Sequence, residues 1–394
     1  MLYEGLPEAD KARVLTNKGV ADVETRKDGV TVICEDGSRI EGSMLIGAEG
    51  VHSPVRGAMR RLALKECPTA VVNDEKPFLT TYRCMFGLSP LVPGFEPAET
   101  WSCHGHGASS MVFVGKDVGF FLVYEQLDKP TRERHRYTQE EKEDFVQRLG
   151  HIPLTSNRNF KEMYSIAQET TLVDLQEGFL EVFSHDRICV VGDALCKHTP
   201  NAGHGFNSAI QDVTVLVSNL YRMLEKHPKE QPVKTESIRA VMTGYQKERE
   251  PHLRDVWQAT YIVTRLQAGY NCLYWALERW IVPALDLSTA VFTIALGRVT
   301  REGRVLPYLP ETQLLHGKVP WVHYPDGAVK PARKNEFSWA GVINWGRLAI
   351  GLLFILFPLL LASMGRNEFA VPGSCQDQIV MGLPGPAKGS AAAH

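Results

Sequence analysis

The alternation of apolar and polar positions near the start of the chain predicts a β meander behind a short helical end. The apolar positions of its strand-like runs are Val20, Val23, Val30, Val32 and Ile33. Turn sequences that contain Asp-Gly, at 27–29 and 35–37, separate these runs, and such sequences favour tight hairpin connections. We therefore expect short antiparallel strands in this part of the chain.

Two later apolar runs each lead into an acidic residue beside glycine and then into a helix start. The first run, Ser43–Ile46, precedes Glu49, and it is followed by Ser53 and Pro54. Serine and proline in this order are typical of the N-cap and the first position of a helix. The second run is Ile188–Val191, which leads into a Gly-Asp pair. Both runs predict a strand, a turn and a helix in succession.

The second turn continues into a polar loop that carries Asp193, Pro200, Gly203 and Gly205. The helix expected after it has a polar side with Ser208, Gln211 and Asp212, and an apolar side with Ala209, Ile210, Val213 and Leu216. A carboxylate at a strand end, a loop with few Cβ atoms and a helix N-terminus together suit a hydroxyl-rich, anionic ligand.

The segment between the two turns predicts a sheet. Runs rich in aromatic and branched residues mark strands at Phe78–Phe86, Ser110–Val114 and Val118–Glu125, and a polar helical stretch follows at Thr138–Arg148. The pair His104 and His106 lacks further ligands at metal-binding spacing, so no metal site is predicted.

The last third of the chain is predicted to be helical and then strongly apolar. Pro251 opens a long helical pattern that suits either a packed helix or a membrane-apposed face. Leu348–Met364 carries no charge and would extend for about 26 Å as a helix, slightly less than a bilayer core of about 30 Å. Trp345 and Arg347 before it and Arg366 after it are typical membrane anchors. A membrane span or anchor is therefore favoured over a buried helix.

Composition excludes some partners and indicates a reducing compartment. The 394 residues carry a net charge of −2, so nothing indicates a nucleic-acid partner. The eight cysteines are scattered without C-x-x-C pairs, which is typical of reduced thiols rather than a disulfide framework. With the apolar C-terminus, this predicts a membrane-associated protein with one C-terminal span and its catalytic part in the cytosol.

The two turns resemble the FAD-contacting motifs of FAD-dependent monooxygenases of the aromatic-hydroxylase type. The run from Gly192 to Asn207 is most similar to a fungal branch that epoxidises prenyl chains of meroterpenoids and indole diterpenes. One departure is Glu49, where the family usually has Asp. The cofactor-binding residues implied by the resemblance are Gly192, Asp193, Pro200, Ala202, Gly203, Gly205, Phe206, Asn207, Glu49 and Arg56.

The same resemblance implies a catalytic or substrate-orienting residue, Arg83, on the first strand of the predicted sheet. Its alternative is a strand arginine that points to solvent. A third family motif, G-x-G-x-x-G, finds no match in the first 40 residues, which contain only isolated glycines. We therefore expect the chain to begin partway into the family's first domain and to bind FAD weakly.

The predicted fold class is α/β, with a truncated Rossmann-like FAD-binding domain, a β-sheet substrate domain and a helical, hydrophobic C-terminus. The predicted segments are a partial FAD-binding domain (1–60), a substrate domain (61–183), the second part of the FAD-binding domain (184–246), a helical region (247–337), a membrane anchor (338–366) and a disordered tail (367–394).

The activity implied is a monooxygenase that uses FAD, NAD(P)H and O2 to epoxidise or hydroxylate a small hydrophobic substrate, either prenylated, terpenoid or derived from a polyketide. Two alternatives stay open. One is a truncated, non-catalytic remnant of such an enzyme. The other is a related flavoprotein with different redox chemistry, such as a dehydrogenase or a halogenase.

Overall fold

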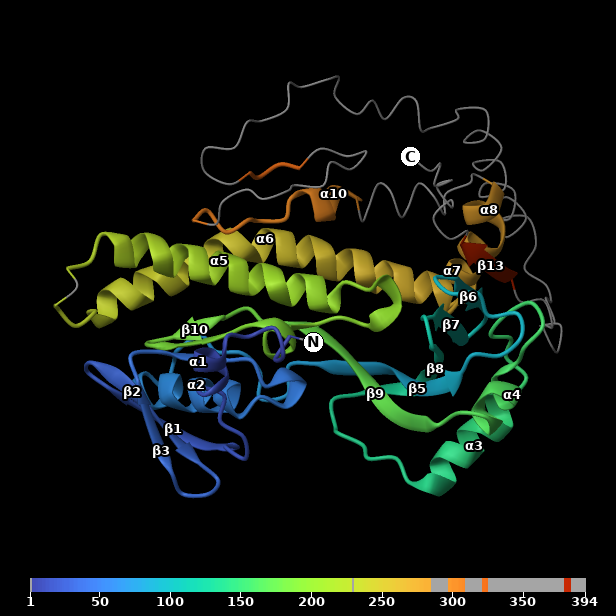
Figure 1. The fold of residues 1–394 in the computed structure, drawn as a ribbon, viewed down its shortest axis with the longest axis horizontal. Coiled ribbons are helices and arrows are strands. Elements are labelled where there is room, and N and C mark those ends of the chain that lie inside the picture. The colour runs from blue at the N-terminus through green and yellow to red at the C-terminus, as the bar shows by residue number, and fades with distance from the viewer. Residues whose placement is uncertain (1, 229, 285–296, 309–320, 325–378, 384–394) are drawn as a thin grey trace.

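The computed structural model describes residues 2–228, 230–284, 297–308, 321–324 and 379–383. Figure 1 shows two long helices, α5 and α6, side by side along one side of the molecule, with the sheets beneath them. The meander of β1 to β3 lies at one end, and α3 and α4 lie at the other. The architecture is α/β, as the sequence predicts.

The first strands form the expected meander and the first of the two predicted turns. The meander consists of β1 (Val20–Arg26), β2 (Gly29–Cys34) and β3 (Arg39–Gly42), paired in chain order after the short helix α1 (Glu8–Lys11). The turn follows as β4 (Leu45–Gly47), the 3₁₀ segment η1 (Gly50–His52) and α2 (Pro54–Glu66). Ser53 caps α2, because its Oγ accepts the backbone N–H of Arg56 at 3.1 Å.

A small sheet brings the two predicted turns together. It contains β10 (Ser184–His185), β11 (Ile188–Val190) and β4, in the order β10-β11-β4. β11 runs parallel to β4, with Ile188 opposite Leu45. Since the carboxyl ends of parallel strands lie at one edge of a sheet, the turns after Gly47 and Val190 become neighbours although 143 positions separate those two residues.

The larger sheet is antiparallel. Among the described residues its strand order is β12-β9-β5-β8-β7-β6-β13. Its strands are β5 (Leu79–Pro90), β6 (Thr100–His104), β7 (Ala108–Val114), β8 (Val118–Thr131), β9 (Glu169–Phe179), β12 (Cys196–Lys197) and β13 (Ile379–Leu383). The predicted strands correspond to β5, β7 and β8, whereas no strand was predicted at β6 or β9. The polar stretch after them forms α3 (Gln139–Leu149), which Thr138 caps, and α4 (Phe160–Ser165) follows.

The second turn leads into the helical part of the chain. Its elements are the 3₁₀ segments η2 (Gly192–Ala194) and η3 (Pro200–Ala202), then α5 (Gly205–Glu225) and α6 (Thr235–Gln267). The later elements are α7 (Cys272–Ala276), the π-helical η4 (Leu277–Ile281), α8 (Val282–Ala284) and α10 (Gly297–Arg301). The helical pattern predicted from Pro251 begins earlier than expected, because α6 starts at Thr235 and Pro251 lies inside it.

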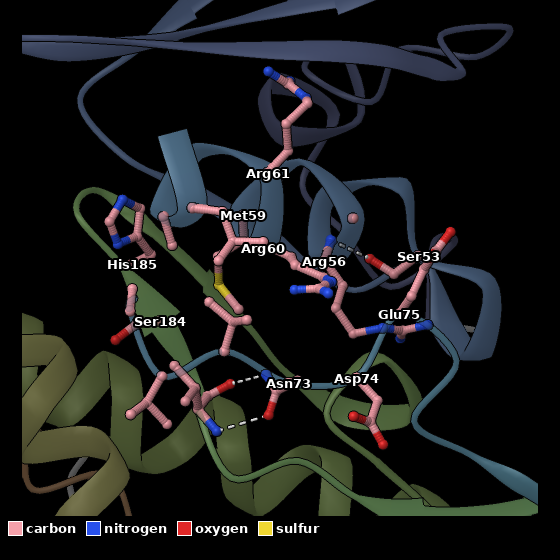
Figure 2. A pocket seen from close by; sticks show the side chains of 17 residues that line it. Ser53, Arg56, Met59, Arg60, Arg61, Asn73, Asp74, Glu75, Ser184 and His185 are labelled. Atoms are coloured by element: carbon pink, nitrogen blue, oxygen red, sulfur yellow. Dashed lines mark hydrogen bonds between the residues drawn. The ribbon is translucent and has the colours of Figure 1, made fainter. Parts of the chain in front are cut away.

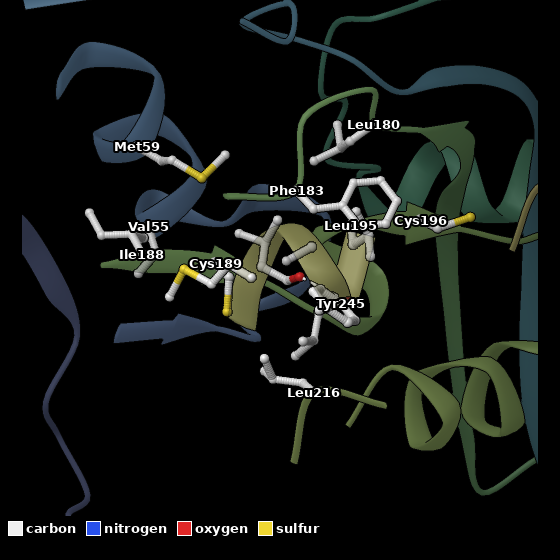
Figure 3. Packing of buried hydrophobic residues seen from close by; sticks show 14 of the residues in the cluster. Val55, Met59, Leu180, Phe183, Ile188, Cys189, Leu195, Cys196, Leu216 and Tyr245 are labelled. Carbon is white, nitrogen blue, oxygen red and sulfur yellow. Dashed lines mark hydrogen bonds between the residues drawn. The ribbon is translucent and has the colours of Figure 1, made fainter. Parts of the chain in front are cut away.

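A hydrophobic cluster beneath α5 and α6 fixes the small sheet against the helices. Figure 3 shows Val55 and Met59 of α2 facing Ile188 and Cys189 of β11, with Tyr245 of α6 among the same packed side chains. Each of these five residues is at most 3% exposed. The cluster therefore packs α2 and α6 against the small sheet, whose strands lead into the two turns.

Burial does not follow the polar and apolar sides predicted for α5. Ser208 and Asp212 of the polar side are buried, whereas Ile210 and Val213 of the apolar side are 44% exposed and Leu216 of that side is buried. The reason is that Ser208 and Asp212 have polar partners in the interior, described below. Burial of a polar group costs little once its hydrogen bonds are made.

The prediction of a membrane-spanning C-terminus and of membrane association is corrected. Within the described ranges, which end at residues 228, 284, 308, 324 and 383, no helix combines the length and the apolar character needed to cross a bilayer. The apolar run Leu348–Met364 and the tail predicted to be disordered, 367–394, lie outside the described residues except for Ile379–Leu383, which form β13.

Candidate functional site

The Gly-Asp turn is held by a buried carboxylate on the following helix. Gly192 adopts a φ of 60°, a left-handed conformation that glycine adopts without strain. Its N–H donates to Oδ2 of Asp212 at 2.8 Å. Asp212 is 1% exposed, and burial raises the pKa of its carboxyl group. The backbone of Gly192 is thus held by the side chain of Asp212, twenty positions further along the chain.

A buried arginine on α6 completes this attachment. Nε of Arg249 donates to Oδ1 of Asp212 at 2.6 Å, and its Nη2 donates to Oγ of Ser208 at 2.8 Å and to the Ser208 carbonyl at 3.1 Å. Arg249 is only 2% exposed. An ion pair withdrawn from water in this way is strong only when its remaining hydrogen bonds are made. Asp212 and Arg249 therefore position the turn relative to both long helices.

The glycine loop offers open space next to the start of α5. Gly203 has a φ of 66°, and Gly205 is the first residue of α5. A Cβ atom added at either glycine would meet no other heavy atom within 4 Å. No side chain caps this end of α5, so its first N–H groups face the open side with a partial positive charge.

A cavity of about 580 Å³ joins the turn, the loop and the larger sheet. Its lining from the turn and loop includes Gly192, Asp193, Pro200, Gly203, Gly205 and Phe206. Phe86 of β5 and Leu175 of β9 form the sheet side, and Ile210 and Val213 of α5 form another apolar wall. The side chains left exposed on α5 therefore line this cavity. The carboxylate of Asp193 accepts a hydrogen bond from Nζ of Lys197, also in the lining.

The first turn lies beside this cavity and is braced by Arg56. The Glu49 carboxylate accepts a hydrogen bond from Oγ of Ser53 at 2.7 Å. Nη1 of Arg56 donates to the carbonyl of Ala194 at 3.0 Å, and its Nη2 donates to the carbonyl of Val51. Burial lowers the pKa of Arg56. Arg56 thus links the two turns through their backbones.

Arg56 also lines a second cavity, of about 540 Å³, between α2 and residues 70–75 (Figure 2). Figure 2 shows Arg56 and Arg60 on one side of this space and Asn73 on the other, where Asn73 is hydrogen-bonded to the backbone of Val182. Arg61 points away from it toward Asp22, with which it forms an ion pair. Two acidic residues, Asp74 and Glu75, also line this second cavity.

Arg83 lies apart from the predicted cofactor residues. Its Nε donates to Oε2 of Glu125 at 2.6 Å, and its guanidinium stacks over Tyr137 and Phe145. Side chains alternate between the two faces of a strand, so Arg83 projects from the face of β5 opposite Phe86, which lines the cavity. The structure does not bring Arg83 to the cavity, and its catalytic role stays a prediction from the resemblance.

The remaining predicted residues are close to the cavity but outside its lining. Ala202 lies in η3 within the loop, Asn207 lines a neighbouring cavity with His204, and Glu49 follows Ala48, which is in the lining. Sequence reasoning missed Lys197, Asp212 and Arg249. Lys197 lies within the recognised motif, while the other two gave no local signal because their partners are far along the chain.

The residues present fit the flavin side of FAD. Open space at two glycines accommodates a planar ring, an uncapped helix start suits its negative charge, and a carboxylate at the turn suits a hydroxyl-rich chain. The open space, the helix start and the carboxylate all belong to residues that the structure describes.

Comparison with known proteins agrees with this geometry. Residues 1–260 match a family described as FAD binding domain. The chain belongs to this FAD binding domain family. It is 32% identical to the FAD-dependent monooxygenase olcE of Penicillium canescens over 70% of this chain and 60% of that protein. It is also 32% identical to the FAD-dependent monooxygenase spyC of Aspergillus fumigatus, over 72% of this chain and 60% of that protein. The chain thus spans about 60% of the length of these relatives.

Solved structures agree at the level of the fold. HpxO of Klebsiella pneumoniae, complexed with FAD and uric acid, superimposes with a TM-score of 0.53. It is 19% identical over 72% of this chain and 66% of that chain. At this identity the likeness supports the α/β fold with a sheet domain and carries nothing further.

Proposed function

We propose that the chain forms the flavin-binding and substrate-facing part of an FAD-dependent monooxygenase that uses NAD(P)H and O2. The observation that carries this proposal is one continuous cavity, in which the Gly-Asp turn, the open glycine loop and the larger sheet meet. FAD, when bound, supplies the redox chemistry and the activation of O2. The protein supplies binding, orientation and exclusion of water.

Each group has a distinct part in that task. The carboxylate of Asp193 accepts hydrogen bonds from ligand hydroxyl groups. The backbone at Gly203 and Gly205 allows a planar ring to approach closely, because no Cβ intervenes. The N-terminus of α5 stabilises negative charge that develops on a group in front of it, without a charged side chain.

The sheet side of the cavity supports an apolar substrate. Phe86 and Leu175 form this wall, and Phe206 stands 62% exposed at the start of α5. Such surfaces exclude water and orient hydrocarbon groups. We propose epoxidation or hydroxylation of a prenylated, terpenoid or polyketide-derived compound as the reaction class.

The test is FAD titration of the purified chain and of Asp193→Ala, followed by flavin fluorescence. We expect saturable binding by the wild type and an affinity at least about tenfold lower in the variant, from loss of a charge-assisted hydrogen bond. Asp28→Ala, an exposed carboxylate of the meander, is the matched control and should bind as the wild type does. Equal affinities in all three proteins, or no binding by any, would contradict the assignment.

Activity is tested in the same preparation. NADPH oxidation that consumes O2 and rises with a prenylated aromatic compound supports monooxygenation. FAD reduction without O2 consumption, or with halide dependence, would instead indicate one of the other flavoprotein chemistries.

A further inference from the structure

A cavity of about 390 Å³ beside the start of α5 has no part in the proposed function. It lies between α5, α6 and residues 300–305, which begin within α10 and which we call the strap. Figure 1 shows α10 against α6, on the side of that helix opposite the small sheet. Ligand sites in proteins commonly enclose about 300–1,000 Å³. This strap cavity is therefore large enough for part of a small molecule.

The strap is attached to α5 by one side chain. Oε1 of Gln211 accepts the N–H of Arg304 at 2.5 Å, and Nε2 of Gln211 donates to the Arg304 carbonyl at 3.3 Å. Gly303 lies against the same amide, because an added Cβ would be 3.5 Å from Nε2 of Gln211. Nη1 of Arg304 also pairs with Oε1 of Glu248 of α6 at 3.2 Å. The strap cavity is thus bounded by contacts to both long helices.

Four polar residues that line the strap cavity are already engaged with the protein. The amide of Gln211 binds the strap, and the guanidinium of Arg304 has its ion pair with α6. Ser208 and His252 both accept hydrogen bonds from Arg249. A ligand therefore gains little from charge or hydrogen bonding at these four residues.

Apolar side chains from all three elements line the same cavity. They are Phe206 and Ile210 of α5, Val256 of α6 and Val305 of the strap, together with Trp321. Phe206 is 62% exposed and Ile210 is 44% exposed, so both present surface that a ligand can cover. Water finds few partners beside such side chains, and a hydrocarbon group that replaces it is stabilised.

The strap cavity is adjacent to the cavity assigned to the flavin. Phe206 and Ile210 line both cavities. These two residues lie about one helical turn apart at the start of α5. A molecule whose reacting end is in the flavin cavity can therefore extend past the first turns of α5 into the strap cavity.

We propose that the strap cavity binds the hydrocarbon chain of the substrate and limits the chain length that the protein accepts. The inference rests on the proposed function, since it places this chain next to the flavin cavity. Phe206 and Ile210 contact the chain where it leaves the flavin cavity, and Val305 contacts its far end. These residues determine specificity and take no part in the chemical step.

Titration calorimetry at saturating FAD tests the inference with three probes, which are phenols that carry one, two or three isoprene units. In the wild type the affinity should rise by at least about tenfold for each added unit, because each unit removes further apolar surface from water. The heat capacity change of binding should become more negative along the series.

Variants of the strap locate the effect. Val305→Trp fills the strap cavity, so the gain from the second and third units should be lost while the one-unit phenol binds as it does to the wild type. Val305→Ala should keep the gain. Val322→Trp is the matched control, because Val322 is 40% exposed and lines neither cavity; it should leave the whole series unchanged. A misfolded Val305→Trp would lose the one-unit phenol as well.

Photo-cross-linking locates the chain in the wild type itself. The three-unit phenol, with a diazirine at the far end of its chain, should label peptides that contain Val305 or Val256, as identified by mass spectrometry. The one-unit phenol with the same group should not label Val305.

The outcomes separate the inference from the proposed function. Failure of the wild type to bind FAD would overturn the proposed function and this inference with it. In a protein that binds FAD, four results would overturn the inference alone. They are equal affinities for the three phenols, no binding of any phenol, an unchanged gain in Val305→Trp, and labelling confined to residues outside the strap cavity.

Discussion

At the scale of single residues, the site depends on polar groups removed from water. Asp212 and Arg249 satisfy each other and hold Gly192. His198 differs, since one of its nitrogens has no partner in the described part of the chain. The cost of burying these groups is tolerated because it fixes the loop in one conformation. Asp212 and His198 also make stability depend on their protonation states, because burial shifts the pKa of both groups.

Acid is therefore expected to destabilise the protein through His198. Burial lowers the pKa of His198 from its ordinary value of 6.5, which it has in the unfolded chain, to about 3 in the folded chain. The unfolded chain binds the extra proton between these values, so the contribution to stability is complete above pH 6.5 and falls as the pH drops toward 3. Between pH 6.5 and 5 the loss is about 2 kcal/mol.

Urea unfolding at pH 7 and pH 5 measures this effect. His198→Asn has no titrating group at this position, so its stability should fall less between the two pH values than that of the wild type. Parallel losses in both proteins would show that other groups cause the acid sensitivity.

At the scale of elements, close contact between neighbouring strands limits which side chains fit in them. Gly87 of β5 pairs with Phe121 of β8. A Cβ at Gly87 would lie 2.0 Å from Cζ of Phe121, which is 1% exposed. The ring of Phe121 thus occupies the space that a side chain at Gly87 would need, and it packs edge to face with Phe160 of α4. Glycine at position 87 therefore leaves room for the ring of Phe121, through which the sheet packs against α4.

Gly87→Ala is expected to destabilise the chain by about 1–3 kcal/mol, the usual range for over-packing a core. Gly57→Ala is the matched control, since Gly57 is exposed on α2 and has open space around it. That change should stabilise by about 0.5–1 kcal/mol, because alanine favours the helix. Chemical denaturation compares the two, and a harmless Gly87→Ala would mean that Phe121 can move away.

At the scale of the whole molecule, α6 joins the hydrophobic cluster around the small sheet to the larger sheet. Its first half contributes Val241 and Tyr245 to the hydrophobic cluster that fixes the small sheet against the helices. At its other end Arg265 forms a two-pronged ion pair with Glu177 of β9, with N–O distances of 2.7 and 2.5 Å. The same end holds the glycine loop, since Asn201 donates to Gln267 at 2.8 Å. The relative placement of loop and sheet thus depends on one helix.

Arg265→Met should destabilise the protein by about 3–5 kcal/mol, because it leaves the buried Glu177 carboxylate without its cation. Adding Glu177→Gln should recover most of the loss, since the uncharged amide still accepts from Thr81. Arg254→Met removes an exposed helix pair with Glu250 and should change stability little. Thermal unfolding of the wild type and these three variants measures the effect, and a double variant no more stable than Arg265→Met would contradict a direct pair.

Local pattern predicted several elements of this molecule correctly. Asp-Gly turns and alternating valines predicted β1 and β2, Ser53-Pro54 predicted the start of α2, and Thr138 predicted the start of α3. These signals are local because capping and turn geometry involve residues within a few positions. The motif around Asp193 was also recognisable, because its spacing is contained in one strand, loop and helix start.

Tertiary structure decided what local pattern could not. The sequence by itself determined the strand–turn–helix units and the chemistry of their loop residues. Only the fold decided that α5 buries Ser208 and Asp212 rather than Ile210, because the partner of that polar face, Arg249, lies 37 positions beyond Asp212. Only the fold turned Arg83 toward Glu125 and away from the cavity. Contacts between residues far apart in the sequence decide both outcomes, and a pattern of neighbouring residues does not predict such contacts.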